Sequence, residues 1–272
     1  MDLYLEVSLA SSKLLTKAYS TSFSLGIRTL DEKVHDPIYA VYGFVRLADE
    51  IVDTFHSHDK AALLQRFRED TYRAIEEKIS LNPILHSFQW AVNKFGMERE
   101  LIDAFLYSME LDLTKRDYNP EEYKKYIYGS AEVVGLMCLR VFCDGDAQQY
   151  DSLKEDACAL GSAFQKINFL RDIRSDYDER GRVYFPGIDF TTFTDEEKRE
   201  IEADIQLDFD AGLRGIHLLP DVARKGCLLA YEYYIRLFEK IKSLPASRIK
   251  EERIRVADWE KMFIYFQLAL RK

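Results

Sequence analysis

One stretch of the chain, residues 165–176, limits most strongly what the whole can fold into. Four side chains that carry oxygen are spaced three, four and four residues apart in it, so on a helix of 3.6 residues per turn they share one stripe. They are Gln165, Asn168, Asp172 and Asp176. The other faces carry apolar residues, among them Ile167, Leu170 and Ile173. The pattern predicts a tightly packed helix whose polar stripe faces a cavity or water.

A second carboxylate stripe lies earlier, in the sequence YGFVRLADEIVD of residues 42–53. Asp49 and Asp53 are again four residues apart, and Arg46 precedes them by one turn. Like charges at this spacing cost roughly 0.2–0.5 kcal/mol on an isolated helix, so two such stripes call for solvent or a cation. Mg²⁺ prefers carboxylate oxygens and commonly completes its shell with substrate phosphates. One aspartate pair is most often a solvated surface, but two pairs favour a site for Mg²⁺ and a diphosphate.

The net charge of −9 and a pI near 5.2 argue against a nucleic-acid partner, because binding to a phosphate backbone needs a basic face. The arginines around the second stripe are therefore expected to bind a small anionic substrate. They are Arg171, Arg174, Arg180 and Arg182.

The length and composition of the chain predict a single domain over residues 1–272. A chain of 272 residues with 47% hydrophobic content can bury one large core. The 12 glycines and 6 prolines are scattered and form no linker.

Cysteine spacing and the apolar stretches bear on the compartment of the protein. The four cysteines lack a CxxC spacing and are interpreted as buried free thiols in a reducing compartment. The first residues carry acids where a signal peptide has basic residues. The longest apolar stretches, 133–142 and 262–270, are too short to span a bilayer. We expect a cytoplasmic protein with at most peripheral contact to a membrane; the oligomeric state is left open.

Helical periodicity dominates the chain, and no alternating run of strand length appears, so the fold class is predicted to be all-α. A hydroxyl-rich turn with a glycine stop is expected over residues 19–26, and Pro37 is expected to begin a helix. The helices are expected over residues 3–17, 38–54, 59–79, 86–95, 98–114, 151–176 and 222–244, with further helices beginning at Pro120 and Thr194.

Small residues recur inside two of these helices. Gly129 and Gly135 belong to one, and Gly161 belongs to the helix of the second stripe. Because glycine costs about 1 kcal/mol in a helix interior, its repeated use indicates either close helix packing or a space left open for an apolar ligand. The sequence favours neither.

Three motifs in order resemble the squalene and phytoene synthase family. The first is the YGFVRLADEIVD of residues 42–53, the second is YIYGSAEVVG of residues 126–135, and the third runs from residue 165 to 176 and on through RGRVYFP. The similarity covers nearly the whole chain, from about residue 19 to about residue 253. Within the family the chain looks most like bacterial phytoene synthases.

The resemblance implies a single-domain, all-α isoprenoid synthase fold with a central cavity, and a prenyltransferase that joins two allylic diphosphates head to head. Its members form a cyclopropylcarbinyl diphosphate, which ionises again and rearranges. It implies prenyl diphosphate substrates and Mg²⁺, in two or three ions, or Mn²⁺. NADPH is not expected, because nothing in the sequence is typical of a nucleotide-phosphate site.

Site residues follow from the resemblance, position by position. The metal and catalytic positions are Asp49, Asp53, Asp172 and Asp176, with Asn168 as a further metal ligand and Tyr126 at the position implicated in the carbocation steps. The substrate-binding positions are Ser20, Ser22, Phe23, Ile27, Tyr42, Arg46, Gln165, Asn168, Arg171, Tyr184, Tyr234 and Arg253.

Two departures from the family pattern affect these assignments. Tyr19 stands where the pattern usually has histidine, and Thr21 stands where lysine is frequent, which puts the phosphate role of this segment in doubt. Glu132 replaces a glycine. Since a buried carboxylate would disfavour an apolar chain beside it, we expect Glu132 to point away from the cavity or to pair with a base.

Ile27 bears on the length of the substrate. It lies one helical turn after Phe23, at a position where relatives with shorter substrates carry a large aromatic residue. A smaller side chain leaves a deeper tunnel and favours geranylgeranyl diphosphate, with phytoene as product. The alternatives are a squalene or dehydrosqualene synthase that uses farnesyl diphosphate, a terpene cyclase, and a non-catalytic assembly factor. Assembly factors of this kind typically have eroded aspartate pairs, and both pairs are intact here.

Overall fold

The structure, a computed structural model, is all-α, as predicted. It describes residues 2–19, 21–251 and 253–270, with the side chains of residues 21–23, 180, 258 and 268–270 left aside. Within these residues the only strand-like pairing is an isolated bridge between Asp117 and Val183. The helices are α1 (Leu3–Tyr19), α2 (Thr21–Arg28), α3 (Glu32–Asp53), α4 (Lys60–Glu77), α5 (Pro83–Phe95), α6 (Arg99–Thr114), α7 (Pro120–Ile127), the π-helical turn η1 (Tyr128–Glu132), α8 (Val133–Cys143), α9 (Ala147–Arg180), α10 (Asp195–Leu218), α11 (Asp221–Lys242), α12 (Ala246–Ile249) and α13 (Asp258–Leu270).

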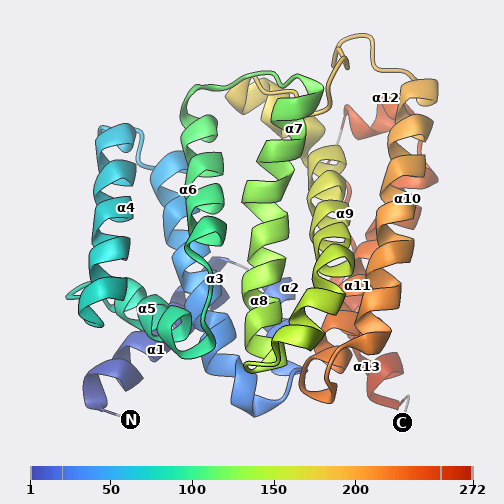
Figure 1. Cartoon of the computed structure of the whole chain (residues 1–272). Helices are drawn as coiled ribbons and strands as arrows, with labels where there is room; N and C mark the ends of the chain where they lie inside the picture. The colour runs from blue at the N-terminus through green and yellow to red at the C-terminus, as the bar shows by residue number, and fades with distance from the viewer. Residues whose placement is uncertain (1, 20, 252, 271–272) are drawn as a thin grey trace.

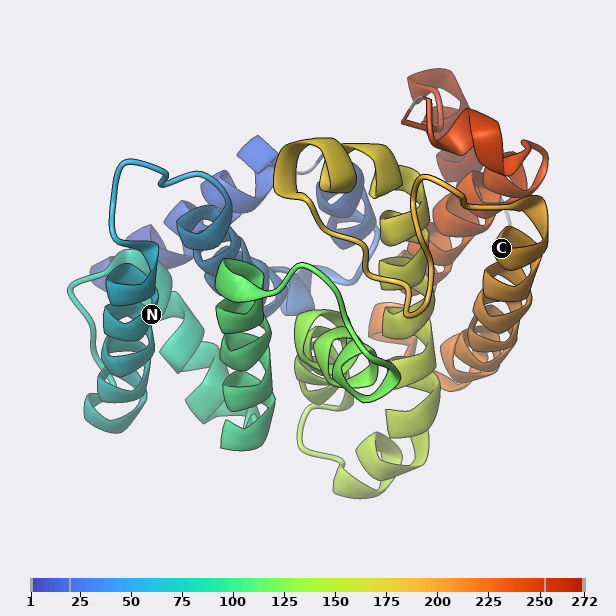
Figure 2. The ribbon, with the colours of Figure 1, turned by 90° about the horizontal axis from the view of Figure 1, so that it is seen from above.

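The two helices with aspartate stripes, α3 and α9, run in the same direction. Figure 1 shows both rising from the lower to the upper end of the bundle, so their carboxyl-terminal turns lie at the same end. Helix α9 packs on α8, α10 and α11, while α3 packs on α1, α5 and α8. Seen from above, α3 and α9 lie on different sides of the middle of the helical bundle (Figure 2). This arrangement places the two aspartate stripes at one end of the bundle.

Local capping signals set several helix starts where the sequence predicts them. Asn119 accepts backbone N–H bonds at the start of α7 and forms a capping box with Glu122. Thr194 and Glu197 form a capping box at the start of α10. Each box satisfies amide groups that the first helical turn leaves unpaired.

Two predictions in the first 54 residues are wrong. The segment expected as a turn contains helix α2, which packs on α1, α3 and α11. Helix α3 begins at Glu32 instead of at Pro37, because the Asp31 side chain accepts a hydrogen bond from the amide of Lys33 and caps the helix there. Pro37 lies inside the helix.

A continuous helix runs from Pro120 to Cys143 through α7, η1 and α8. It is longer than the apolar stretch considered above and is apolar enough to span a bilayer by length and composition. However, 61% of its apolar window is buried inside the protein, where it packs on α6 and α9. Gly129 explains the close packing on α6, since a Cβ atom there would lie 2.4 Å from the carbonyl oxygen of Ala104. At this glycine the structure favours close helix packing over open space.

Candidate active site

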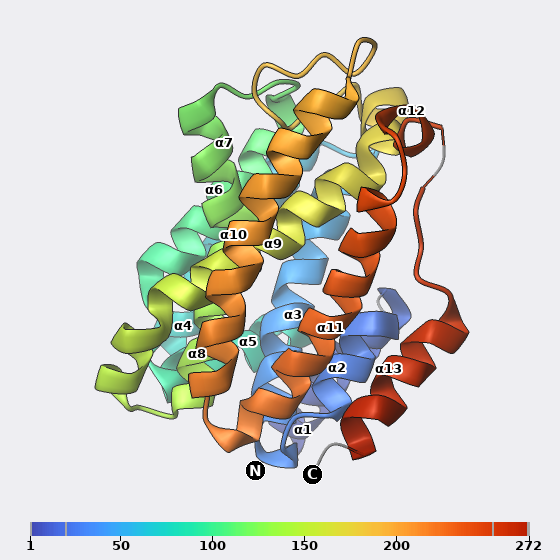
Figure 3. The same ribbon diagram turned by 90° about the vertical axis from the view of Figure 1, so that its right-hand side faces the viewer.

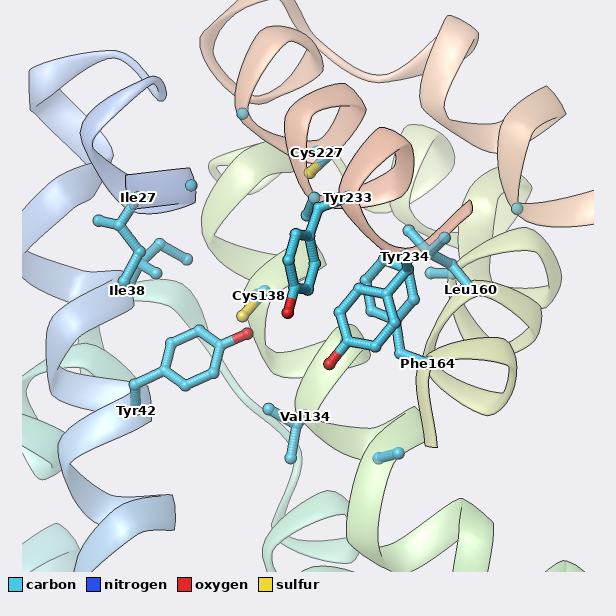
Figure 4. Close-up of a pocket in the computed structure, with 18 of the residues that line it drawn as sticks. Ile27, Ile38, Tyr42, Val134, Cys138, Leu160, Phe164, Cys227, Tyr233 and Tyr234 are labelled. Carbon is cyan, nitrogen blue, oxygen red and sulfur yellow. The ribbon is translucent and has the colours of Figure 1, made fainter. Parts of the chain in front are cut away.

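A cavity of about 600 Å³ opens between α2, α3, α8, α9 and α11, with contributions from α10 and α13. Most of its wall is apolar. Figure 4 shows Ile27 from α2 and Ile38 from α3 on one side and Leu160 and Phe164 of α9 on the other, with Val134 of α8 below and between them. The rings of Phe164 and Tyr234 are stacked, with centroids 4.0 Å apart. A long apolar chain fits such a wall because burial removes its surface from water.

Polar side chains gather at one end of this cavity. Arg46 and Asp49 come from α3, and Gln165, Asn168 and Arg171 come from α9. Arg253, on the segment between α12 and α13, also lines the cavity. The amide groups of this end are held in place by neighbours: Tyr234 donates a hydrogen bond to Asn168 Oδ1 (3.2 Å), and Asn168 Nδ2 donates to Gln165 Oε1 (3.4 Å). The name polar head is used below for six lining residues: Arg46, Asp49, Gln165, Asn168, Arg171 and Arg253.

Two arginines of the polar head pair with the first aspartate of the α9 stripe. Arg171 Nε donates to Asp172 Oδ1 at 3.0 Å, and Arg253 Nε lies 2.7 Å from the same oxygen. Only 19% of the Asp172 side chain is exposed, whereas half of the Arg253 side chain is. Because Arg253 comes from a distant part of the sequence, this pair joins the chain after α12 to the carboxylate stripe of α9. Both guanidinium groups are thus placed where an anionic head group would meet them.

The carboxyl group of Asp49 is in an unfavourable place for a negative charge. Burial raises its pKa to about 7 from the ordinary value of 3.8, and the charges of Asp53 and Asp112 act in the same direction. Arg46 opposes them, with a guanidinium nitrogen 3.5 Å from Asp49 Oδ2, but it also pairs with Glu50 at 3.3 Å. The site therefore has a carboxylate whose charge a cation would stabilise.

Beside the carboxylate stripes lies a buried network centred on Asp112 of α6. Tyr126 donates a hydrogen bond to both carboxylate oxygens of Asp112, at 2.9 and 3.0 Å. Arg182 pairs with Asp112 at 2.9 Å and donates to the hydroxyl of Tyr184 at 3.2 Å. The rings of Tyr118, Tyr126 and Tyr184 pack together, with centroids 4.9–5.6 Å apart. The phenol of Tyr126 is thereby fixed in one orientation.

The turn after α9 brings Arg182 into this network. Gly181 adopts a left-handed conformation (φ 61°), which ends the helix and turns the chain back. The amide of Arg182 then donates to the carbonyl of Asp176 at 2.9 Å, and the amide of Val183 donates to the carbonyl of Arg116 at 3.0 Å. The RGRVYFP segment, residues 180–186, thus connects the end of α9 to the end of α6 by hydrogen bonds and an ion pair.

Nine of the predicted site residues line the cavity. They are Ile27, Tyr42, Arg46, Asp49, Gln165, Asn168, Arg171, Tyr234 and Arg253. Five others do not line it and lie in or along the carboxylate stripes and the Asp112 network: Asp53, Asp172, Asp176, Tyr126 and Tyr184. Ser20 falls outside the described residues, as do the side chains of Ser22 and Phe23.

Several lining or supporting residues were missed by the sequence analysis. Asp112 occupies a core register of α6, seven residues after Phe105 and three after Met109, and a carboxylate in that register is a signal that could have been used. Tyr233 gives no such signal. Figure 4 shows the hydroxyl ends of Tyr42, Tyr233 and Tyr234 pointing into the cavity between α3 and α11.

Glu132 does not line the cavity in the described structure, in agreement with the expectation that it points away from it. It accepts a hydrogen bond from the thiol of Cys158, and burial raises the pKa of its carboxyl group to about 7. The charge of Lys166 favours its ionised form. Lys166 itself is bound to Asp204 and Asp208 of α10, the latter at 2.7 Å. Glu132 therefore belongs to a polar contact between η1, α9 and α10.

Among the described side chains, no three His, Cys, Asp or Glu residues come together as a ready-made metal site. This agrees with the chemistry of Mg²⁺, which is commonly bound by one or two carboxylates together with substrate phosphates and water. The donors present, aspartate pairs on two helices and the amide oxygen of Asn168, fit that cation. They do not form a cage that would hold it without a substrate.

These features define a class of protein: an all-helical bundle with a cavity that has an apolar body, a head rich in arginine and amide groups, and aspartate pairs beside it. A family model for squalene/phytoene synthase matches residues 16–260, and the chain belongs to this family. The family joins prenyl diphosphates head to head, and the relatives are prenyltransferases, which confirms the predicted enzyme class at the level of the family.

Individual relatives agree with this assignment. A presqualene diphosphate synthase of Sinorhizobium fredii is 32% identical over 69% of this chain and 66% of its own length. A phytoene synthase of Rhodobacter capsulatus is 33% identical over 63% of this chain and 50% of its own length. The chain thus spans between half and two thirds of these relatives. A crystal structure of a dehydrosqualene synthase in complex with a ligand has the same fold, with a TM-score of 0.81 at 20% identity over 97% of this chain and 96% of that one.

Proposed function

We propose that the protein condenses two molecules of geranylgeranyl diphosphate head to head, through a cyclopropylcarbinyl (prephytoene) diphosphate, to phytoene, a step of carotenoid biosynthesis. The observation that carries this proposal is the cavity of about 600 Å³ with a polar head at one end and an apolar body behind it. The phytoene synthase among the relatives supports the product. Ile27, which is almost fully buried and lines the apolar body, supports the longer substrate because it leaves more space than an aromatic ring would.

The residues of the polar head would act on the diphosphate of the substrate that ionises. Arg46, Arg171 and Arg253 would bind its oxygens by charge-assisted hydrogen bonds and stabilise the negative charge that develops as the carbon–oxygen bond breaks. Asn168 and Gln165 would orient it. Mg²⁺, bound through Asp49, Asp53, Asn168, Asp172 and Asp176, would supply further positive charge to the leaving group.

The apolar body would hold the two hydrocarbon chains and exclude water from the carbocation. Phe164 and Tyr234 offer stacked ring faces to the cavity, and an aromatic face stabilises a nearby cation by about 1 kcal/mol or more when desolvated. Tyr126 lies outside the lining, so its proposed part in the carbocation steps depends on the Asp112 network, which orients its hydroxyl.

A second candidate is a presqualene, squalene or dehydrosqualene synthase that acts on farnesyl diphosphate. The presqualene diphosphate synthase of Sinorhizobium fredii, at 32% identity, favours it. The same polar head would serve both substrates, because they differ only in the length of the apolar chain. The body of the cavity decides between them.

A two-substrate assay tests the proposal. Purified protein with Mg²⁺ or Mn²⁺ is given farnesyl or geranylgeranyl diphosphate separately, with and without NADPH, and extracted hydrocarbons are identified by mass spectrometry. We expect phytoene from the longer substrate, independent of NADPH. Product from farnesyl diphosphate alone, either a hydrocarbon or presqualene diphosphate, would establish the second candidate, and neither kind of product from folded protein would indicate a non-catalytic relative.

A further inference from the structure

Helix α13 carries large apolar side chains on its outer face. The exposed fractions of the residues are 70% for Trp259, 45% for Met262, 55% for Phe263 and 56% for Phe266. Their spacing of three, one and three residues places them on one stripe of the helix. In a globular protein such a stripe normally faces the core, but here it faces outward. Figure 3 shows α13 on the outside of the bundle beside α11.

The opposite face of α13 closes the cavity. Lys261 and Ile264 line it, so at this place the wall between the cavity and the outside is one helix thick. The start of α13 is fastened to α11 through Glu260, which is almost fully buried. Glu260 accepts hydrogen bonds from Arg236 Nε (3.2 Å) and the amide of Ala257 (2.9 Å), and it pairs with Lys240. The orientation that turns the stripe outward is therefore built into the fold.

Charge around this helix differs from that of the rest of the molecule. Residues 246–272 contain seven Lys or Arg and four Asp or Glu, whereas the whole chain has a net charge of −9. Arg255, three residues before α13, is exposed, whereas Arg248 lies further back on α12 and pairs with Glu251. A basic segment next to an apolar stripe is complementary to a surface that is anionic outside and apolar beneath.

We propose that the outer stripe of α13, formed by Trp259, Met262, Phe263 and Phe266, docks on a lipid bilayer that contains anionic lipids. The stripe would enter the boundary between head groups and acyl chains while the helix lies in the plane of the surface. In this orientation the side of the cavity that α13 covers faces the acyl chains of the bilayer. The inference rests on the proposed function in one respect: a hydrocarbon product would leave the cavity past α13 into the bilayer.

Vesicle sedimentation without substrate tests the docking. Purified protein is mixed with vesicles of phosphatidylcholine alone or with added phosphatidylglycerol. We expect sedimentation with the anionic vesicles and at least a tenfold loss of affinity in the double variant Trp259→Ser, Phe263→Ser. The matched control is Leu207→Ser, Leu218→Ser, which removes two exposed apolar side chains from α10 and is expected to bind as the unchanged protein does.

Fluorescence gives a second measurement that does not depend on the folding of the double variant. The chain has two tryptophans, Trp90 and Trp259. Anionic vesicles should shift the emission to shorter wavelength, and Trp259→Phe should abolish the shift while sedimentation persists, because phenylalanine keeps the apolar contact. Circular dichroism checks the fold of each variant, and Phe263→Gln replaces the double variant if the latter unfolds.

Three results would overturn the proposal: no sedimentation with anionic vesicles, equal sedimentation of the α13 and α10 variants, or a dimer in light scattering that the α13 substitutions abolish while vesicles are not bound. The last would identify a second copy of the chain as the occupant of the stripe. Because no substrate is present, vesicle binding by a protein that makes no hydrocarbon would refute the proposed function alone. Phytoene formation without vesicle binding would refute the docking alone.

Discussion

At the scale of single residues, Asp49 is a carboxyl group whose negative charge the fold tolerates poorly. Burial and the nearby carboxylates raise its pKa to about 7, so the native state holds this proton more tightly than the unfolded chain does. The contribution of Asp49 to stability is therefore fully present below about pH 4 and is lost as the pH rises toward 7. A cation at the site would remove this penalty.

The substitution Asp49→Asn tests this reading of the site. In metal-free protein we expect it to raise the melting temperature at pH 8, where the native carboxyl group is ionised, and to have much less effect at pH 4.5. It should also lower kcat at least tenfold. Scanning calorimetry at both pH values and the hydrocarbon assay measure the two effects. The control is Asp151→Asn, an exposed carboxylate paired with Lys154 at 4.0 Å, for which no pH-dependent gain is expected.

A second prediction concerns Gly26, which lines the cavity. A Cβ atom built there meets nothing within 4 Å, so a larger side chain enters open space. We expect Gly26→Leu to lower kcat/KM for geranylgeranyl diphosphate at least tenfold more than for farnesyl diphosphate, because it shortens the space for the longer chain. Ile27→Phe should act in the same direction. Steady-state kinetics with both substrates measure this change.

The control for the cavity variants is Ala18→Leu, which introduces the same large apolar side chain as Gly26→Leu at an exposed position of α1. It should leave the ratio of the two kcat/KM values unchanged. If Gly26→Leu and Ile27→Phe both kept full activity on the longer substrate, neither position would limit chain length.

At the scale of elements, local signals were sufficient for some helices and insufficient for others. The starts of α7 and α10 follow from Asn119-Pro120 and from Thr194 with Glu197, because a capping box is made within one turn. Helix α2 was missed because its eight residues include serine, threonine and glycine, which are poor helix formers on their own. Its contacts with α1, α3 and α11 supply the missing stabilisation.

The link between α6 and the turn after α9 gives a prediction at this scale. Only 8% of each side chain of the Asp112–Arg182 pair is exposed. The substitution Asp112→Ala leaves the guanidinium buried without its counter-charge and removes the acceptor of Tyr126. We expect a loss of about 3–5 kcal/mol in the free energy of unfolding. Urea denaturation followed by circular dichroism measures it.

The comparison for this prediction is Arg73→Ala, which breaks an exposed pair with Asp70. It should change the free energy of unfolding by less than about 1 kcal/mol, because exposed ion pairs contribute little. Similar losses for the two variants would mean that the Asp112 network is not a structural link.

At the scale of the whole molecule, the polar head is assembled from parts that are remote in sequence. Arg46 comes from α3, Arg171 from α9 and Arg253 from the segment before α13. In the described structure the last two pair with Asp172. Because the described carboxylates form no cage by themselves, Mg²⁺ and a diphosphate should bind together and not separately.

Thermal unfolding with Mg²⁺ and inorganic pyrophosphate tests this coupling. At concentrations about 100 times Kd, the pair should stabilise the protein by about 2.7 kcal/mol, which corresponds to a shift of roughly 5–10 °C, whereas each component alone should have little effect. Arg253→Ala should reduce the shift and Arg248→Ala should not, since Arg248 lies on α12, where it pairs with Glu251, and does not line the cavity. An equal shift with pyrophosphate alone would contradict the coupling.

The sequence by itself determined the helical class, the two aspartate stripes and the family, because helical periodicity and residue spacing are properties of short segments. Arg46, Asn168 and Arg171, whose roles in binding substrate or metal stay predictions from the resemblance, line the cavity in the structure, and each shares a helix with its stripe. Only the tertiary structure decided that Tyr126 lies outside the cavity lining on Asp112, that Tyr233 lines the cavity, and that α13 closes it with an apolar face turned outward. These features depend on which faces of distant helices meet, and that is settled by packing of the whole chain, not by any local pattern.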